Sequence, residues 1–332
     1  MKSHRLRSLC CWAIDLIDIR PVVSDQTMPI HPKKDKVAFI PQWKLHRWLL
    51  FYGCMVFTIH HLYVWWAGQN LSAMSAFAFY SISHGLISLH GLRILCRLGD
   101  YLGYLEEWKR PRDTVPEKRV QKVLGGLLFM YFLRPILPFT LSYRADKLPL
   151  SINWWCLPLV ISIYSIVLDF WFYWYHRLMH EVSFLRRYHR AHHDSKSPTS
   201  LLLVYFDAEE GFLNSVVIPL LAWQTLRTIG LPMDFYEWWV CNGYVAFAEF
   251  AGHGGVRFYA PAPLPCTAVL KYWNAEIIPE DHDIHHRLGE RENFNYGKQT
   301  RLWDRIFGTC HDRIECIDGN IDYENPVTLP LF

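Results

Sequence analysis

The chain has 332 residues, of which 51% are hydrophobic and 16% aromatic, and its formal net charge is only +3. An aromatic content this high is typical of membrane proteins. The Lys and Arg residues are scattered around apolar blocks without a continuous basic stripe, which argues against nucleic acid as a partner. The nine cysteines are odd in number and form no C-x-x-C pair, so we expect reduced thiols in a cytosol-facing or membrane-embedded protein.

Residues 1–47 are predicted to form an irregular cytosolic segment near a membrane surface, because prolines and lysines recur along them. They contain no clear cleavable signal peptide, since Asp15 and Asp18 interrupt the apolar residues near the start. Two apolar runs follow, at 48–66 and 71–95, and each is long enough to cross a bilayer. The short turn between the two runs predicts a helical hairpin, and the basic residues after it place the next loop in the cytosol.

A second predicted hairpin, 123–142 and 155–175, ends directly before His176 on the cytosolic side. Two further apolar runs, 212–229 and 235–252, are either spanning or re-entrant. We therefore predict an all-α integral membrane protein with about four transmembrane helices in two hairpins, a further membrane-embedded or re-entrant helical pair, and a cytosolic helical cap that carries most of the histidines. The predicted divisions are an N-terminal cytosolic segment (1–47), transmembrane helices with a cytosolic loop (48–154), a histidine-rich domain (155–310) and a C-terminal tail (311–332).

Nine of the 17 histidines gather at this expected cytosolic boundary. Most of them fall in three boxes of the forms H-x3-H and H-x2-HH, spacings that put imidazoles on one face of a helix. Because one zinc or iron ion takes three or four protein ligands, nine histidines exceed one ion and predict a binuclear site. Imidazole suits iron that meets dioxygen, and zinc binds the same donors, so both metals stay open. The predicted ligands are His176, His180, His189, His192, His193, His253, His282, His285 and His286.

The first box superficially resembles the zinc-protease helix H-E-x-x-H, in which the Glu is the general base. Its second position here is Arg177, which cannot accept a proton, so a hydrolase of that type is improbable. Asp169 lies on the same helical stripe as His176, and a carboxylate within a membrane span needs a partner. We expect Asp169 to accept the free N–H of a ligating imidazole. The alternative is a bond to a polar group of a neighbouring helix.

The order and spacing of the motifs are similar to those of the fatty acid hydroxylase/sterol desaturase superfamily, over roughly residues 155–310. The motifs are D-x3-Y-x2-HR-x2-H at 169–180, HRAHHDSKSPTS at 189–200, GHGG at 252–255, HDIHH at 282–286 and NYGKQTRLWDRIFGT at 295–309. This resemblance implies a multi-pass oxygenase of the endoplasmic reticulum membrane whose active site faces the cytosol. It also implies a di-iron centre, O2, a hydrophobic substrate, and electrons from NAD(P)H through cytochrome b5 and its reductase or an equivalent donor.

The chain departs from the family's pattern at two places. Members often carry F-H-P-x-E after the second box, where this chain has Glu210 at the acidic position but Asp207 in place of the histidine. Some members have a histidine where this chain has Glu249, which makes Glu249 a candidate ligand or supporting group. His253 matches the family's H-x-G, which favours ligation.

Asp304 lies in the C-terminal motif, on a short amphipathic helix that we expect to cap the site. Its carboxylate is a candidate to hydrogen-bond a ligand histidine. A surface salt bridge with Arg301 or Arg305 is an equal alternative.

The expected reaction is the hydroxylation or desaturation of an unactivated C–H bond in a lipid-like substrate, which is beyond side-chain acid–base chemistry and requires the metal. Fatty acyl, sterol, sphingoid and terpenoid substrates all stay open. The alternatives are an oxygenase with a different outcome, such as epoxidation or decarbonylation, and a non-catalytic membrane protein with structural zinc.

Overall fold

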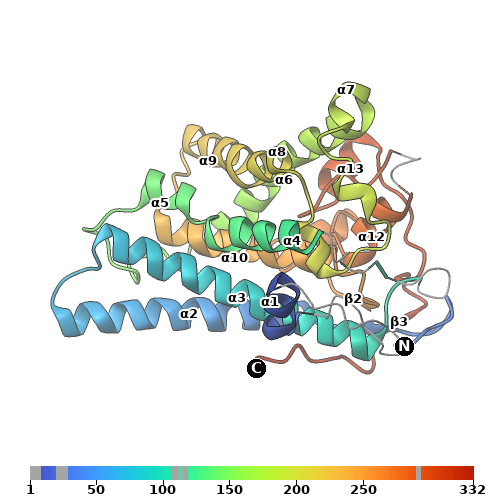
Figure 1. Ribbon diagram of the computed structural model, residues 1–332, viewed down its shortest axis with the longest axis horizontal. Coiled ribbons are helices and arrows are strands. Elements are labelled where there is room, and N and C mark those ends of the chain that lie inside the picture. The colour runs from blue at the N-terminus through green and yellow to red at the C-terminus, as the bar shows by residue number, and fades with distance from the viewer. Residues whose placement is uncertain (1–8, 20–28, 107–111, 114, 116–118, 289–292) are drawn as a thin grey trace.

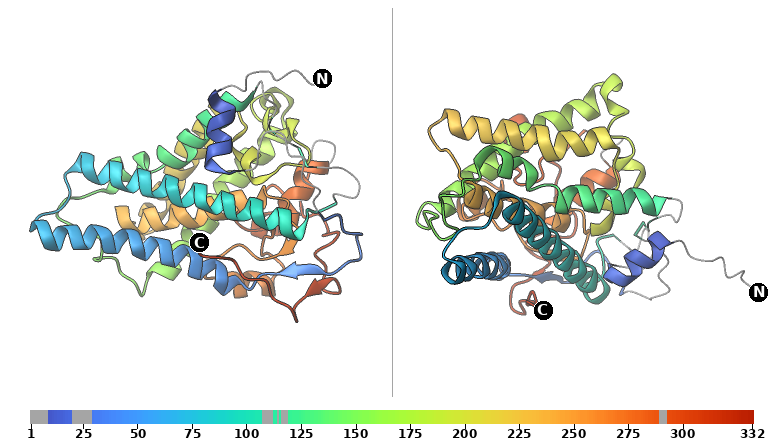
Figure 2. Two further views of the ribbon diagram at one scale, coloured as in Figure 1. Left: turned by 60° about the horizontal axis from the view of Figure 1, so that its bottom comes forward. Right: turned by 60° about the vertical axis from the view of Figure 1, so that its left-hand side comes forward.

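The computed structural model describes residues 9–19, 29–106, 112–113, 115, 119–288 and 293–332. Long helices lie side by side along the long axis of the molecule, and short helices and strands gather at one end of them (Figures 1 and 2). We call this end the cap; it is formed mainly by residues 183–204, 253–288 and 293–322. The chain is mostly helical, as the sequence predicts.

The first predicted hairpin corresponds to helices α2 (Gln42–Ala67) and α3 (Ala73–Leu102). Helix α2 ends at Gly68, whose φ of 67° is a left-handed conformation that glycine adopts without a Cβ clash. Helix α3 begins after Ser72, whose side chain accepts the backbone N–H of Ser75 at 3.2 Å. The local sequence therefore sets both ends of this turn.

The run predicted at 123–142 is helical but broken into three pieces. Helix α4 (Val120–Leu127) continues into a π-helical turn, η2 (Leu128–Phe132), and α5 (Ile136–Ser142) follows after Pro135. Proline lacks an N–H and clashes with the preceding turn, which accounts for an interruption at this place. The break brings the buried guanidinium of Arg134 to the carboxylate of Glu249, 2.7 Å away.

The remaining long helices enclose the centre of the molecule. Helix α6 (Leu157–Glu181) packs against α9 (Ile218–Thr228) and α10 (Phe235–Gly252), and α10 also packs against α3. Helix α9 is preceded by α8 (Ala208–Phe212) and a π-helical turn, η5 (Leu213–Val217). Helix α10 begins with a capping box between Asp234 and Glu237, which satisfies two backbone N–H groups.

Three segments of the described chain are long and apolar enough to cross a membrane: Gln42–Ala67, Val120–Ser142 and Leu157–Glu181. The prediction of about four spans in two hairpins is therefore met only in part, because α3 is not one of the three. Helix α3 is the longest described helix, but serines and histidines along it, among them Ser81, His84 and Ser88, lower its mean hydropathy. Helix α9, with 11 residues, is too short to cross a membrane, and α10, with 18 residues, is long enough but not apolar enough.

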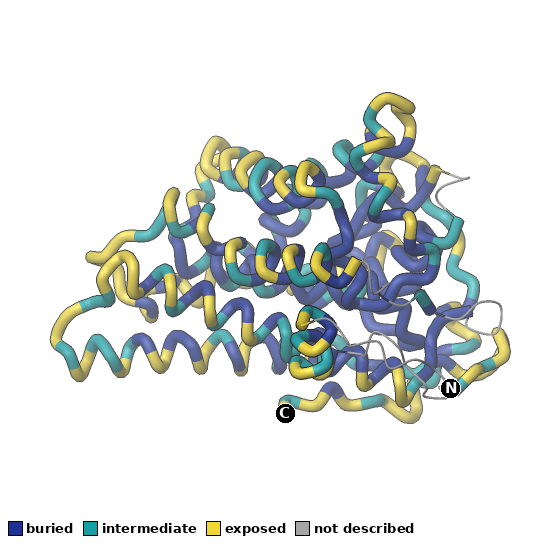
Figure 3. Tube along the Cα trace, viewed as in Figure 1, coloured by how far each residue is buried: buried dark blue, intermediate teal, exposed yellow. Residues whose placement is uncertain are grey.

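The outer surface of the long helices is apolar. On α2, Trp65 and Trp66 are 80% and 78% exposed, and Leu62 is 55% exposed. Figure 3 shows that exposed residues recur along α2 and at the ends of the long helices, whereas much of the cap is buried. Exposed aromatic and aliphatic side chains of this kind are typical of lipid-facing helices.

A small parallel sheet ties distant parts of the chain to the cap, and the sequence did not predict it. Its central strand β1 (Val37–Phe39) lies in the N-terminal segment expected to be irregular, between β2 (Phe258–Tyr259) and β3 (Ile321–Asp322). The predicted tail 311–332 is thus part of the fold. The other short helices are α1 (Leu9–Ile17), α7 (Ser183–Arg186), η3 (His192–Asp194), η4 (Ser200–Val204), α11 (Thr267–Tyr272), α12 (Pro279–Leu288) and α13 (Leu302–Phe307).

Candidate metal centre

The structure brings all nine predicted histidines together where the long helices meet the cap. They come from the end of α6, the loop after α7 with η3, the end of α10, and α12. Every one of them is buried. Helix α12 contributes three histidines, because its first two are three residues apart and the third follows directly.

The nine imidazoles form two separate groups, and within each group the possible ligand atoms lie within 4.8 Å of one another. The first group has five members and the second has four, so each is large enough for one ion with three or four protein ligands. Group one is His176, His180, His189, His193 and His285; group two is His192, His253, His282 and His286.

Backbone carbonyls fix the tautomer of four of these histidines, two in each group. In group one, Nδ1 of His176 lies 2.7 Å from the carbonyl oxygen of Tyr296, and Nδ1 of His285 lies 2.8 Å from that of Phe294. In group two, Nδ1 of His253 lies 2.7 Å from the carbonyl oxygen of Glu249, and Nδ1 of His286 lies 3.2 Å from that of Ser195. A carbonyl oxygen can only accept, so each Nδ1 carries the proton and each Nε2 presents a lone pair.

These lone pairs point toward neighbouring imidazoles. Nε2 of His253 lies 2.9 Å from Nε2 of His282, and Nε2 of His176 lies 3.0 Å from Nε2 of His189. Nε2 of His286 is buried, with no hydrogen-bond partner in the described part of the chain. A buried acceptor without a donor costs free energy unless a cation binds it. The donor set therefore fits a pair of metal ions.

The histidines outside the long helices are neutral at physiological pH. Burial lowers the pKa of His189 and His285 to about 3 and that of His192 to about 4. A neutral imidazole is the form that binds a metal. No proton has to leave these rings before an ion can bind.

The expected bond between Asp169 and a ligand imidazole is wrong. The Asp169 carboxylate accepts the backbone N–H groups of Lys298 and Gln299, each at 2.9 Å, and that of Thr300 at 3.1 Å. It also accepts the Thr300 hydroxyl at 2.7 Å. Asp169 thus holds the loop after residue 297 against α6. The alternative, a bond to a polar side chain of a neighbouring long helix, is not found among the described residues either, because residues 298–300 supply the donors.

The carboxylates of Glu249 and Asp304 do not contact any of the nine histidines, but both residues support groups that do. The Glu249 carboxylate binds Arg134 and Lys298, at 2.7 and 2.9 Å, and lies in neither histidine group, while its backbone carbonyl supports His253. Asp304 accepts the N–H groups of Tyr296 and Gly297, each at 2.8 Å, instead of a histidine N–H or a surface arginine. It therefore fixes the loop whose Tyr296 carbonyl orients His176.

Glu210 is the acidic side chain that reaches the histidines directly, 2.8 Å from Nδ1 of His189. Burial raises the pKa of Glu210 to about 7, and a dication on His189 would oppose that shift. In the sequence, Glu210 is indicated only by its match to the acidic residue of the family's F-H-P-x-E motif. Asp207, which replaces the family's histidine, forms an ion pair with Lys122 at 2.6 Å and is outside both groups.

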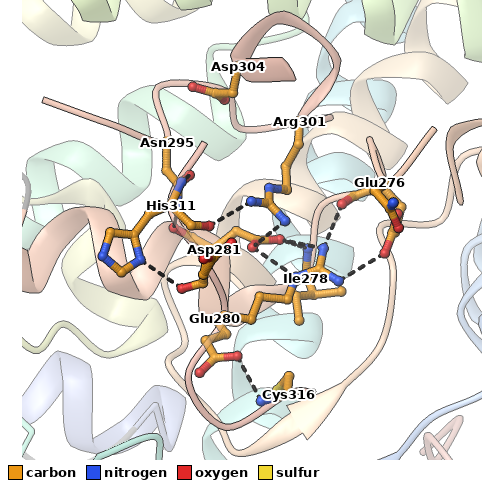
Figure 4. A network of polar contacts seen from close by, with 12 residues as sticks. Glu276, Ile278, Glu280, Asp281, Asn295, Arg301, Asp304, His311 and Cys316 are labelled. Atoms are coloured by element: carbon orange, nitrogen blue, oxygen red, sulfur yellow. Dashed lines mark hydrogen bonds and ion pairs between the residues drawn. The ribbon is translucent and has the colours of Figure 1, made fainter. Parts of the chain in front are cut away.

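The first turn of α12 is anchored in a network of buried polar contacts (Figure 4). The Asp281 carboxylate binds Arg313 through two bonds, of 2.9 and 3.0 Å, and accepts the backbone N–H of Ile278. Glu280 accepts the N–H groups of residues 314–316, at 2.6 to 3.0 Å. Segment 311–316 therefore sets the position of the helix that carries three of the nine histidines.

The fold and the site define a helical protein with membrane-length helices and a candidate centre for two metal ions. The fatty acid hydroxylase family matches residues 161–309. Fatty acid hydroxylase vlmA of Lecanicillium sp is 38% identical over 309 residues, which are 89% of this chain and 84% of that protein. The chain therefore belongs to the fatty acid hydroxylase family, within the superfamily predicted from its motifs.

More distant relatives carry other names. Methylsterol monooxygenase 2-1 of Arabidopsis thaliana is 28% identical over 224 residues, which are 62% of this chain and 78% of the relative. The very-long-chain aldehyde decarbonylase GL1-8 of Oryza sativa subsp. japonica is 27% identical over 245 residues, which are 70% and 84% of the two chains. No solved structure matches the chain.

Proposed function

We propose that this protein is an O2-dependent di-iron oxygenase that hydroxylates or desaturates an unactivated C–H bond of a lipid-like substrate. The observation that carries the proposal is the pair of buried all-histidine groups, each large enough for one ion. The name of the relative that is 38% identical favours hydroxylation, and fatty acyl, sterol, sphingoid and terpenoid substrates all belong to the proposed class.

A cavity beside the two groups supports the proposal. Histidines of both groups line it, among them His176 and His253, together with apolar side chains. Its lining also includes Glu210, Asn214 and Lys298, and its volume of about 20 Å³ has room for a water-sized molecule, such as O2, beside the histidines. The apolar residues of this cavity, which we call the metal-side cavity, are Met130, Phe172, Leu203 and Phe206.

Group one would hold one iron and group two the other, and the bound ions would supply the reduction of O2 and the removal of hydrogen from carbon. The chain's own residues orient the imidazoles through Glu210 and the four carbonyls. Hydroxylation converts R–H, O2, two electrons and two protons to R–OH and water, so each turnover consumes two external electrons. The sequence contains no G-x-G-x-x-G dinucleotide motif. We therefore assign the electrons to NAD(P)H through cytochrome b5 and its reductase, or an equivalent donor.

The proposed place of action is the membrane of the endoplasmic reticulum, with the histidine groups facing the cytosol. The three membrane-length segments support membrane insertion, and the basic residues between α3 and α4 support this orientation.

The test is to purify the full chain in detergent, count the metal ions per chain and measure substrate-dependent O2 uptake with NADH and a cytochrome b5 system. We expect two iron ions and a hydroxylated or desaturated lipid among the products. Replacing His192 and His193 together by Ala removes a ligand from each group and should abolish turnover while membrane insertion is kept. The control is His31→Ala, because His31 belongs to neither group. Unchanged turnover in the double variant, or two zinc ions without turnover, would refute the di-iron oxygenase.

A further inference from the structure

A second, almost wholly apolar pocket lies between α4 and α8. We call it the α4–α8 pocket. Its walls include Gly125, Phe129 and Gly211, and its one charged lining residue is Lys122, which is half-buried and already paired with Asp207 at 2.6 Å. Gly125 and Phe129 belong to Val120–Ser142, one of the three segments that are long and apolar enough to cross a membrane. The pocket therefore lies on a segment that can face membrane lipid.

Phe206 separates this pocket from the metal-side cavity. It lines both of them and is only 8% exposed. Its ring packs on the bare backbone of Gly211, where an added Cβ would come within 2.5 Å of the ring. Glycine at position 211 is therefore what lets the ring lie in this place, between a lipid-accessible pocket and the histidines.

We propose that the α4–α8 pocket admits the alkyl chain of a lipid substrate and that Phe206 is the gate through which this chain reaches the metal-side cavity. This inference rests on the proposed function. Rotation of one phenyl ring opens a passage about as wide as a polymethylene chain, whereas a fused ring system is wider. The gate thus selects extended acyl or alkyl chains over sterols.

A third pocket touches the same histidines from another direction. It is lined by His253 and His282 of group two and by cap residues 258, 260–263 and 277–279. One of its lining residues, Leu45, belongs to the membrane-length segment Gln42–Ala67, but the volume of this third pocket is about 30 Å³, whereas that of the α4–α8 pocket is about 410 Å³. We therefore assign lipid entry to the larger α4–α8 pocket. A lipid probe that labels only the lining of the third pocket would contradict this assignment.

The test uses a long-chain fatty acid that carries a photoactivatable diazirine near its methyl end, added to the full chain in detergent. After illumination, the labelled residues are mapped by peptide mass spectrometry. We expect labels in residues 120–130 and 205–213. Gly125→Phe should remove most of this labelling, because a Cβ at Gly125 meets open space and the new ring fills the pocket without a local clash.

Gly53→Phe is the matched control. Gly53 is also helical, an added Cβ there also meets open space, and it lies outside the α4–α8 pocket. This control should keep the wild-type labelling, and Gly125→Leu repeats the test with a smaller side chain if Gly125→Phe unfolds. Phe206→Ala should let a diazirine-bearing sterol label the metal-side cavity, which the wild type should not allow.

Labels confined to residues 258–263 and 277–279, or labelling by the fatty acid that neither variant of Gly125 lowers, would overturn the proposal. Equal labelling by the sterol in the wild type would overturn the selectivity. Photolabelling needs neither turnover nor bound metal. A failure of the gate is therefore separate from a failure of the di-iron oxygenase, which metal counting and O2 uptake decide.

Discussion

Glu210 differs from the other groups that support the histidines, because it acts through its side chain and can be replaced. Its carboxylate lies 2.8 Å from Nδ1 of His189, and both residues are buried. Residues that orient a ligand histidine typically contribute about 10–100-fold to metal affinity. We expect Glu210→Gln to weaken iron binding by about that factor, measured as the iron retained against a competing chelator.

The neighbouring Glu209 provides a matched control for this prediction, since it is exposed on the same short helix, α8. Glu209→Gln should retain iron like the wild type. If Glu210→Gln also retains iron like the wild type, His189 does not depend on its carboxylate partner.

The histidines could be predicted individually, whereas their supporting groups could not. Histidines repeated at short spacing are a specific signal in a sequence, because few arrangements other than a metal site require several imidazoles close together. The carbonyls of Phe294 and Tyr296 carry no such signal, since every residue has a carbonyl and only the loop conformation directs these two. Asp169 was placed on the correct helical stripe, but its partner, the loop 298–300, lies about 130 residues away in the chain.

At the scale of elements, α12 depends on residues far from it in sequence. The Arg313 guanidinium binds the carboxylates of Asp281 and Glu276, and its side chain is only 14% exposed. Removing one partner of a buried ion pair typically costs about 3–5 kcal/mol. We expect Arg313→Met to lose about 3 kcal/mol of stability, the lower end of this range, because Arg301 still lies 3.3 Å from Asp281.

The measurement for Arg313→Met is thermal unfolding in detergent, where a fall of the melting temperature by several degrees is expected. Arg144→Met is the matched control and should leave the melting temperature nearly unchanged. Arg144 pairs with Asp146 at 3.0 Å, but both side chains are about two-thirds exposed, and water screens such surface pairs so that they contribute little to stability. Equal melting temperatures for the two variants would mean that the buried network does not stabilise α12.

Long helices were predictable because apolar runs of 18 or more residues are rare outside helices. The run predicted at 235–252 coincides with α10. Strands of two or three residues, such as β2 and β1, are too short for an alternating pattern, so the sheet escaped prediction. Helix α3 is not among the three candidate spans, because serines and histidines recur along it and lower its mean hydropathy.

For the whole molecule, the histidine groups join parts of the chain that are otherwise far apart. Group one connects α6, the loop with η3, and α12, while group two connects η3, α10 and α12. A metal ion in each group would cross-link these elements in the folded state alone. Ligands that bind only the native state stabilise it by about 4 kcal/mol at a thousand times their dissociation constant.

Metal removal should therefore lower the stability of the entire protein and not only its activity. We expect dialysis against a chelator to lower the melting temperature in detergent, and added iron to restore it. The variant with His192 and His193 both replaced by Ala serves as the control, because each group has lost a ligand and chelation should change its melting temperature much less. A wild-type protein that loses its metal without any change in melting temperature would show that packing and the cap network, rather than the ions, hold these elements together.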